Sequence, residues 1–521
     1  MTRARLVLAA WLLLALLLVP VFPHFISPNE FSRWAVAAAV VEEGTIEVST
    51  LLPILGSRLE DLSEVDGRIY SNKAPGGALV ALPGYLAGRV IAGPPSASSL
   101  RPVVYVMRWA GSTLPLLVLT VVMVRLARRC GASEDAGAFL LLSMLFGTIC
   151  FTYGLLLFSH ALIAAALFLA WVLLYTRKAG GVGGDYAAGA LVGLAVLSEY
   201  PAAVPAAVLV LGSFRRHDPA RLVRILLGGA PFAIMLAAYN TVAFGGPFHL
   251  SSGFERAGEF RELAGSGLFG IGLPSPAILL RLLFDPSKGL LLFSPLLLLA
   301  PMGWKPLRAA LGRRALFTLV AAPLSILLLY SGYPNWHGGW TVGPRYLVAA
   351  LPFLCFPLAF VWRGRLAACL AGYSVTAVVV TSLVFPFVPP AFPFPWGSFA
   401  FPLMRDGLIT PNALHFVSSG LAVIVPVLVV MIALVAVFRS RELLFVTAGI
   451  LFAMATGHVA ERHVDRSIGV RIQRGYVAEV YFLDRGALPE SAGPGVPLPA
   501  RLIERLRYEM TLPPTSWPFE D

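Results

Sequence analysis

The sequence predicts an all-α protein that crosses a membrane about 13 times. Hydrophobic residues make up 57% of the 521 residues and charged residues only 13%, whereas a soluble domain carries roughly 25% charged residues. Apolar runs long enough to span a bilayer recur along the chain, and the basic residues gather in the short loops between them. These observations exclude a soluble globular enzyme and a disordered chain.

The predicted spans are apolar runs separated by short polar loops. They are 6–22, 102–127, 136–152, 155–175, 187–198, 201–214, 221–243, 289–303, 315–331, 346–362, 366–385, 416–438 and 443–458. The first run could be a signal peptide, but the residues after it, Pro23-His24-Phe25, do not form a small-x-small cleavage site. We therefore expect an uncleaved first helix.

Charge orients the predicted helices. With the N-terminus in the cytoplasm, nearly all basic residues of the short loops fall on the cytoplasmic side, as the positive-inside rule requires. These residues are Arg3, Arg5, Arg125, Arg128, Arg129, Arg177, Lys178, Arg215, Arg216, Arg221, Arg224, Lys305, Arg308, Arg313, Arg314, Arg363, Arg365, Arg439 and Arg441. The net charge of +12 is thus largely a topology signal, and we expect no nucleic-acid partner.

Two large loops and a tail lie outside the membrane in this arrangement. Residues 1–458 form the membrane body, with outer loops at 26–101 and 244–288, and 459–521 form an extracytoplasmic C-terminal tail. The first loop is acidic. Its stretch Pro75 to Gly93 is apolar but broken by Pro83 and Gly84, which favours an interface-lying or re-entrant helix.

Glu30 is the first carboxylate beyond the first helix, at the boundary between lipid and water. Partial desolvation there can raise its pKa toward that of a useful general base. A helix cap, with Ser27 or Asn29 as the N-cap and Glu30 in the first turn, is the structural alternative. Asp66, which precedes the Lys73 segment, is the rival for the role of base.

Two segments fit a sugar-phosphate. Lys73 precedes a Pro-Gly-Gly turn that opens an apolar helix, so the ammonium and the backbone amides suit a phosphate. In the segment 335–346, Trp336, His337 and Trp340 could cover a sugar, while Arg345 could fork two phosphate oxygens. The alternatives are a plain loop for the first segment and an interfacial aromatic belt for the second.

Other polar residues at the outer boundary are weaker candidates. Glu199 lies at the tip of the short helical hairpin 187–214, so we expect it to be recessed below the membrane surface. An ionisable residue at such a place is functional by default. The alternative is a snorkelling or ion-paired Glu. Lys288 follows Asp285-Pro286, which is itself a sufficient helix start, and His160 could equally be a packed histidine.

The GxGxxG at 265–270 follows no strand, and His458 with Glu461 and Asp465 fits a charged membrane exit better than a metal site.

The chain resembles the GT-C superfamily of polytopic glycosyltransferases that use lipid-carrier sugars, and most of all the bacterial protein-mannosyltransferase-like branch, family 39. The resemblance covers roughly residues 5–440. Besides the layout, it rests on the segments 29–33, 70–76, 159–160, 199–200 and 336–345. Such families carry an acidic pair in the first loop, one member of which is the base. Here the pair reads Asn29-Glu30, so the resemblance leaves Glu30 as the base.

The resemblance implies inverting transfer from a polyprenyl-phosphate-linked sugar to a glycan, lipid or protein acceptor on the outer face of the cytoplasmic membrane. It implies Lys73, Arg345 and Lys288 as donor phosphate ligands. The expected sugar or acceptor ligands are Arg33, Asp66, Tyr70, Asn72, His160, Glu199, Tyr200, Trp336, His337 and Trp340. We expect no cofactor and no divalent metal to be required, because cations already present could stabilise the leaving phosphate.

The composition also indicates where the protein works. Arg far outnumbers Lys among the 40 basic residues, which is typical of GC-rich bacteria, so we expect a multi-pass protein of the bacterial inner membrane with its C-terminus outside. A non-enzymatic or transport-type protein for lipid-linked glycans, such as a flippase or a ligase, would work at the same boundary. Sugar transfer from a monosaccharide carrier separates these alternatives.

Overall fold

The computed structural model describes residues 2–22, 25–54, 61–96, 99–176, 181–265, 267, 270–361, 364–390, 392–405 and 409–463. The predictions for most of the tail, 464–521, therefore lie outside the described residues. The body is helical, and the described residues contain one sheet of two short strands. The described residues are mostly helical, as the sequence predicts, but they are not all-helical because of these two strands.

The elements follow one another along the chain as a series of helices, interrupted once by a hairpin. They are α1 (Arg3–Leu18), α2 (Pro28–Glu42), η1 (Ser49–Ile54), β1 (Leu62–Val65), β2 (Arg68–Ser71), α3 (Gly76–Ala92), α4 (Leu100–Arg108), η2 (Trp109–Thr113), α5 (Leu114–Arg129), α6 (Glu134–Leu145), α7 (Cys150–Tyr153), α8 (His160–Tyr175), α9 (Val182–Ser198), η3 (Tyr200–Ala202), α10 (Ala203–Ser213), α11 (Pro219–Phe244), η4 (Ser251–Phe254), α12 (Gly258–Ala264), α13 (Pro276–Phe284), α14 (Leu290–Phe293), η5 (Pro295–Gly303), α15 (Trp304–Leu311), α16 (Arg313–Ser331), η6 (Arg345–Ala350), α17 (Leu351–Cys355), η7 (Phe356–Phe360), α18 (Arg365–Val384), η8 (Trp396–Ala400), α19 (Phe401–Arg405), η9 (Ala413–Phe416), α20 (Ser419–Val437) and α21 (Ser440–His463).

Six described helical segments are long and apolar enough to cross a bilayer, namely Leu100–Arg129, Pro219–Phe244, Arg313–Ser331, Arg365–Val384, Gly420–Val437 and Ser440–His463. Shorter apolar helices lie beside them at Gly76–Ala92, His160–Tyr175, Val182–Ser198, Tyr200–Ser213 and Arg345–Phe360. A multi-pass helical body is therefore present. The predicted count of about 13 spans is not confirmed.

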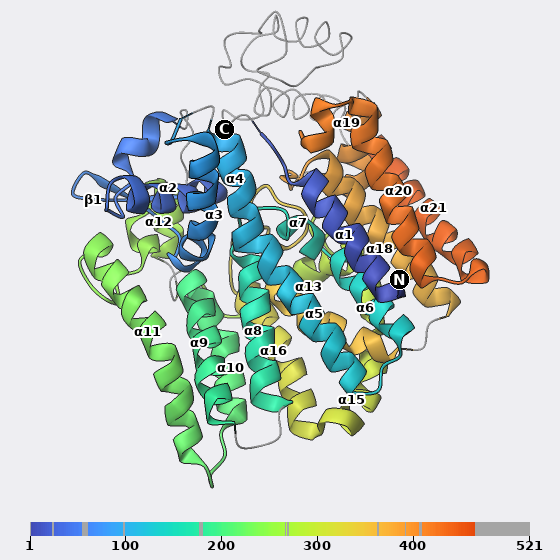
Figure 1. The fold of residues 1–521 in the computed structure, drawn as a ribbon, viewed down its shortest axis with the longest axis horizontal. Helices are drawn as coiled ribbons and strands as arrows, with labels where there is room; N and C mark the ends of the chain where they lie inside the picture. Colours follow the sequence, from blue (N-terminus) through green and yellow to red (C-terminus); the bar gives the residue numbers. More distant parts are fainter. Residues whose placement is uncertain are drawn as a thin grey trace, which may run out of the picture.

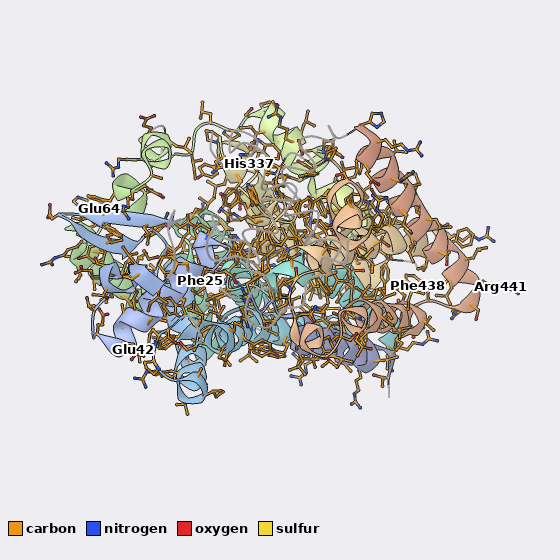
Figure 2. All side chains as sticks on the ribbon, turned by 90° about the horizontal axis from the view of Figure 1, so that it is seen from above. Phe25, Glu42, Glu64, His337, Phe438 and Arg441 are labelled. Carbon is orange, nitrogen blue, oxygen red and sulfur yellow. The ribbon has the colours of Figure 1, made fainter. Side chains whose placement is uncertain are left out.

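The segment between α1 and α4 folds over one end of the helices, where α2, α3, α12 and β1 gather (Figure 1). The turn between α10 and α11 lies at the opposite end of the same view. Seen from above, Glu42 and Glu64 lie toward the rim of this region (Figure 2). The residues of α2 from Asn29 to Ala39 are all buried, so this helix is packed inside the protein rather than lying on a surface.

A β-hairpin that was not among the predicted elements follows α2. Strands β1 and β2 pair antiparallel with Leu62 opposite Ser71, and the turn is Asp66-Gly67 with φ of 50° and 76°. Positive φ at both turn residues is the geometry of a tight type I′ turn. The second outer loop joins the hairpin: Glu255 bridges Ser63, and the Arg256 amide donates to the Leu62 carbonyl at 2.9 Å. The segment between α1 and α4 and the segment after α11 are thus joined by backbone pairing.

The exposed hairpin turn allows a test of the predicted orientation. In a variant without the four native cysteines, a cysteine replacing Asp66 should react with a membrane-impermeant thiol reagent in intact cells. A cysteine replacing His217, which is exposed between α10 and α11, should react only after permeabilisation. Labelling at His217 from outside would contradict the orientation that the basic loops predict.

Candidate active site

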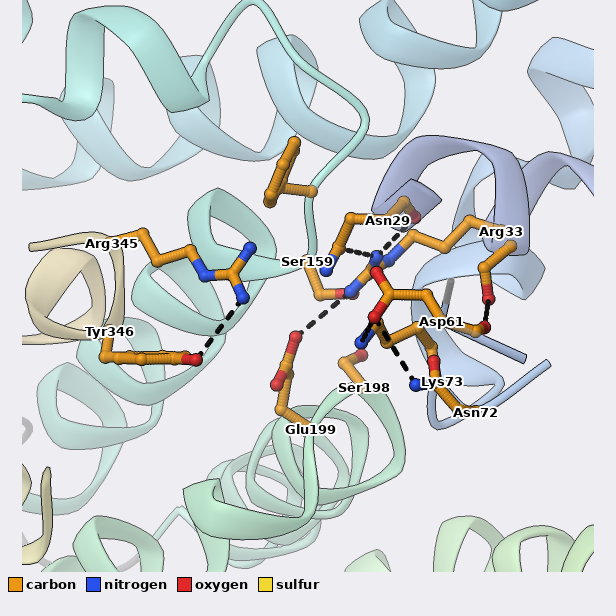
Figure 3. Close-up of polar contacts among 12 residues, drawn as sticks. Asn29, Arg33, Asp61, Asn72, Lys73, Ser159, Ser198, Glu199, Arg345 and Tyr346 are labelled. Carbon is orange, nitrogen blue, oxygen red and sulfur yellow. Dashed lines mark hydrogen bonds and ion pairs between the residues drawn. The ribbon is translucent and has the colours of Figure 1, made fainter. Parts of the chain in front are cut away.

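The candidate site is built around the guanidinium of Arg33, which is 1% exposed. Its Nε donates to Ser159 Oγ at 2.9 Å, and its Nη2 donates to Glu199 Oε1 at 3.0 Å. Its Nη1 donates to the Asn29 carbonyl at 2.8 Å and to the Asn29 side chain. Arg33 therefore joins α2 to the start of α8 and to the tip of the α9–α10 hairpin (Figure 3).

The start of α3 closes over this guanidinium, and glycine is needed there. A Cβ added to Gly77 would lie 2.3 Å from Ser159 Oγ and 3.0 Å from Arg33 Nε. A Cβ added to Gly76 would lie 2.5 Å from Ser198 Oγ. The Pro-Gly-Gly sequence thus lets the backbone that follows Lys73 approach α8 and α9.

Lys73 forms an ion pair with Asp61, a carboxylate that is not among the predicted site residues. Its Nζ lies 2.8 Å from Asp61 Oδ1, and Asn72 Nδ2 donates to the same oxygen at 3.4 Å. No described residue bonds the other oxygen, Asp61 Oδ2. Burial raises the pKa of the Asp61 carboxyl, but the charges of Lys73 and Arg345 and the bonds from Lys73 and Asn72 together hold it below its usual value.

Glu255 reaches the same place from the second outer loop. Asn72 Nδ2 donates to Glu255 Oε1 at 3.0 Å, so one amide group bridges two carboxylates. Burial raises the pKa of Glu255 above its usual value, against the opposing charge of Lys73. Two neighbouring carboxyls with pKa values moved in opposite directions are typical of sites that handle protons.

The Arg345 guanidinium lies across the site from Asp61 (Figure 3). Its positive charge lowers the pKa of the Asp61 carboxyl. Its guanidinium lies over the Tyr346 ring at 5.0 Å and the Phe158 ring at 5.9 Å, and Nη2 donates to the Tyr346 hydroxyl at 3.3 Å. Arg345 forms no ion pair with any carboxylate of the described residues, and its buried Nε has no hydrogen-bond partner there. The structure thus brings to one site Lys73, which is paired with Asp61, and Arg345, which has no ion pair among the described residues.

The geometry does not support Glu30 as the general base. Its carboxylate is 1% exposed, and its two oxygens accept from Arg108 at 2.7 and 2.6 Å. One of them also accepts from the Leu157 amide at 2.7 Å. A carboxylate closed in by a guanidinium and a backbone amide has no room for a hydroxyl group. Glu30 instead fixes α2, α4 and the segment before α8 relative to one another.

Lys288 was predicted to bind phosphate, but its ammonium is hydrogen-bonded to the protein's own backbone. The side chain is fully buried at 0% exposure. Its Nζ donates to the carbonyls of Gly339 at 3.2 Å and Val388 at 2.8 Å, and to Thr341. These bonds occupy the ammonium and tie the loop before Arg345 to neighbouring segments.

Several other predicted ligands lie outside the cluster around Arg33. Asp66 is exposed in the hairpin turn, 5 residues beyond Asp61 in the sequence. Tyr70 is buried against Phe244 at 6.1 Å, and Tyr200 donates to Asn240 at 3.2 Å. Asp66 therefore points to solvent, while the two tyrosine side chains contact other residues of the protein.

The aromatic segment before Arg345 packs mainly within the protein. Trp336 lies under Arg281 at 5.9 Å, and His337 Nδ1 accepts from the Gly339 amide at 3.0 Å. Trp340 is half-buried against the core. Across the described ranges, no three His, Cys, Asp or Glu side chains lie together as a metal site requires; the expectation that no metal is required stays a prediction.

Comparison with known proteins shows that the fold is similar to those of several solved structures. No protein-family model matches the sequence, and the search of curated proteins gave no match. The fold is similar to ArnT from Cupriavidus metallidurans bound to undecaprenyl phosphate, with a TM-score of 0.47 and 15% identity over 98% of this chain and 88% of that chain. It is also similar to the archaeal oligosaccharyltransferase AglB from Archaeoglobus fulgidus, in complex with an inhibitory peptide and a dolichol-phosphate. That TM-score is 0.44, with 13% identity over 94% of this chain and 58% of that chain.

The buried Glu30–Arg108 pair predicts a stability effect. Replacing Glu30 by Gln keeps the shape but leaves the Arg108 charge buried without a counter-charge, so the protein should lose about 3–5 kcal/mol of stability. The thermal melting temperature in detergent should fall, and the double variant Glu30→Gln/Arg108→Gln should recover part of the loss. The exposed Glu43→Gln change is the control and should melt like the wild type.

A Glu30→Gln protein that melts like the wild type but has lost its catalytic activity would contradict the structural role. Such a result would restore Glu30 as the candidate base.

Proposed function

We propose that this protein transfers a sugar from a polyprenyl-phosphate carrier to a hydroxyl group of an envelope acceptor, on the outer face of the bacterial inner membrane. The observation that carries the proposal is Arg345, a cation without a carboxylate partner among the described residues, facing the Lys73–Asp61 pair at one end of a body of membrane helices. In this proposal a phosphate is the ion-pair partner that no described residue gives to Arg345, and a lipid carrier explains why the site adjoins apolar helices.

The donor phosphate lies between Arg345 and Lys73 in this proposal. Arg345 presents a planar fork that matches two phosphate oxygens, while Lys73 offers a point charge. As the bond between the anomeric carbon and the phosphate oxygen breaks, negative charge grows on the phosphate, and both cations stabilise it. This electrostatic stabilisation requires no metal.

Asp61 is the proposed base. The acceptor oxygen attacks the anomeric carbon and inverts it, the acceptor proton passes to Asp61 Oδ2, and the polyprenyl phosphate leaves with the electrons of the broken bond. One base and a stabilised leaving group are sufficient for this displacement. Glu199 is a weaker candidate because Arg33 holds its Oε1 at 3.0 Å. Glu255 is the nearer rival, since it shares the Asn72 amide with Asp61.

Binding of undecaprenyl phosphate tests the phosphate site without knowledge of the sugar or the acceptor. Arg345→Gln should weaken binding roughly 10–100-fold, since a hydrogen bond to a charged group contributes about 1.5–3 kcal/mol. Arg345→Lys should weaken it about 10-fold because the fork geometry is lost. Microscale thermophoresis in detergent gives the dissociation constants. Arg281→Gln, which removes the guanidinium stacked on Trp336, is the matched control. Equal binding by Arg345→Gln and wild type would contradict the phosphate site.

Asp61→Asn should reduce transfer by roughly 10²–10⁴-fold, the usual contribution of a positioned base, and should leave undecaprenyl phosphate binding within a few-fold. Release of polyprenyl phosphate from a panel of hexosyl and pentosyl donors in reconstituted vesicles measures the reaction. A loss of the same size in Glu255→Gln, with full activity in Asp61→Asn, would move the role of base to Glu255.

The pH dependence of transfer follows from the lowered pKa of Asp61. The carboxylate must be ionised to accept a proton, so kcat/KM should stay level as pH falls and decline only below the ordinary Asp pKa of about 4. In Lys73→Met, the loss of the neighbouring charge should raise that pKa and move the acidic decline to higher pH. An unchanged decline in Lys73→Met would argue that another group is the base.

The same vesicles distinguish a transport function from an enzyme. A flippase would move the intact lipid-linked sugar across the bilayer and release no polyprenyl phosphate.

A further inference from the structure

The first turn of α8 contains a buried polar group with no partner. His160 is 7% exposed, and its Nε2 makes no hydrogen bond within the part of the chain that the structure describes. The imidazole is held between the rings of Tyr153 at 5.5 Å, Phe158 at 5.8 Å and Tyr346 at 6.3 Å. Buried polar side chains normally have a partner, so an unsatisfied one points to a missing ligand.

Arg345 shares this environment. Its guanidinium lies over the same Phe158 and Tyr346 rings, and its Nε is the other buried and unpartnered nitrogen beside them. The charges of Arg345, Arg33 and Lys73 all act on His160. Two of these cations are already paired, Arg33 with Glu199 and Lys73 with Asp61, whereas Arg345 has no ion pair among the described residues. A ligand that accepts hydrogen bonds from both nitrogens needs several acceptor oxygens, and a phosphate offers these together with a counter-charge for Arg345.

The start of α8 adds to the same positive environment. Ser159 is the residue before the helix; its hydroxyl accepts from Arg33 and makes no cap bond to the helix. The first backbone N–H groups of α8 are therefore left without a side-chain cap, and such groups attract anions.

We propose that His160 is a phosphate-binding residue, which donates a hydrogen bond to an oxygen of the carrier phosphate in a subsite formed with Arg345 and the first turn of α8. The proposal rests on the function proposed above and assigns the imidazole to the phosphate rather than to the sugar or the acceptor. No proton leaves His160: the ring binds the oxygen that gains charge as the sugar departs, alongside the two cations.

This assignment predicts opposite effects on stability and on binding. In His160→Phe, an unsatisfied polar nitrogen is replaced by an apolar ring in an aromatic environment, so the ligand-free protein should melt no lower than the wild type. Undecaprenyl phosphate should bind roughly 10–100-fold more weakly, as expected for the loss of one hydrogen bond to a charged group. His160→Gln, which keeps a donor at a similar reach, should restore much of the affinity.

The matched control is His249→Phe. The Nδ1 of His249 already bonds the Phe244 carbonyl at 2.8 Å, so this change should leave undecaprenyl phosphate binding unchanged. Undecaprenol, which lacks the phosphate, should bind wild type and His160→Phe alike. Inorganic phosphate should bind far more weakly than the lipid phosphate; equal affinity for both would contradict a lipid carrier as the source of the anion.

The two proposals fail in different ways. If Arg345→Gln weakens undecaprenyl phosphate binding but His160→Phe does not, His160 is not a ligand while the proposed function stands. If His160→Phe melts markedly lower and binds the lipid phosphate normally, the histidine is a packing residue. If neither variant affects binding, the phosphate site itself is wrong.

Discussion

The site depends on one buried cation. Arg33 contacts α2, the first turn of α8 and the tip of the α9–α10 hairpin through direct hydrogen bonds, and the start of α3 closes over it. A guanidinium can make several such bonds at once because its donors lie in a fixed plane. Removing it would leave Glu199 without its cation and Ser159 without its donor, so the geometry around Asp61, Lys73 and Arg345 rests on this residue.

A second charged pair supports the first. Glu30 and Arg108 connect α2 and α4 in the interior, and Glu30 also holds the Leu157 amide just before α8. The sequence Asn-Glu-Phe-Ser-Arg thus places two structural residues, Glu30 and Arg33, one turn apart on α2. The carboxylates proposed for the role of base come instead from the segments after α2 and after α11, where Asp61 and Glu255 both accept from the Asn72 amide.

Much of the fold was predictable, because apolar runs of span length have few alternatives to helices in a bilayer. The orientation that the basic loops indicate stays a prediction. The span count could not be settled in this way, since several apolar helices in the structure are too short to cross a bilayer unaided. Burial could not be foreseen either: nothing in the sequence shows that α2 packs inside the protein or that the Lys288 ammonium is taken up by carbonyl groups.

The site was predictable in part. Lys73 and Arg345 were selected as cations that suit a phosphate, Glu199 as an ionisable residue recessed in the membrane body, and Arg33 through the family resemblance. The structure brings these four residues together. Asp61 was missed although a signal existed. The Asp66-Gly67 pair between two short β-type runs is a strong hairpin signal, and pairing about that turn places Asp61 opposite Asn72, next to Lys73. Glu255 had no such signal, because its place depends on a contact between two loops far apart in the sequence.

The most direct test of the account is a structure of the protein with a polyprenyl phosphate bound. The account predicts that the phosphate lies within hydrogen-bond distance of both Arg345 and Lys73, with the polyprenyl chain running along the apolar helices and Asp61 facing the position of the transferred sugar. A phosphate bound elsewhere, with Arg345 and Lys73 out of its reach, would contradict it.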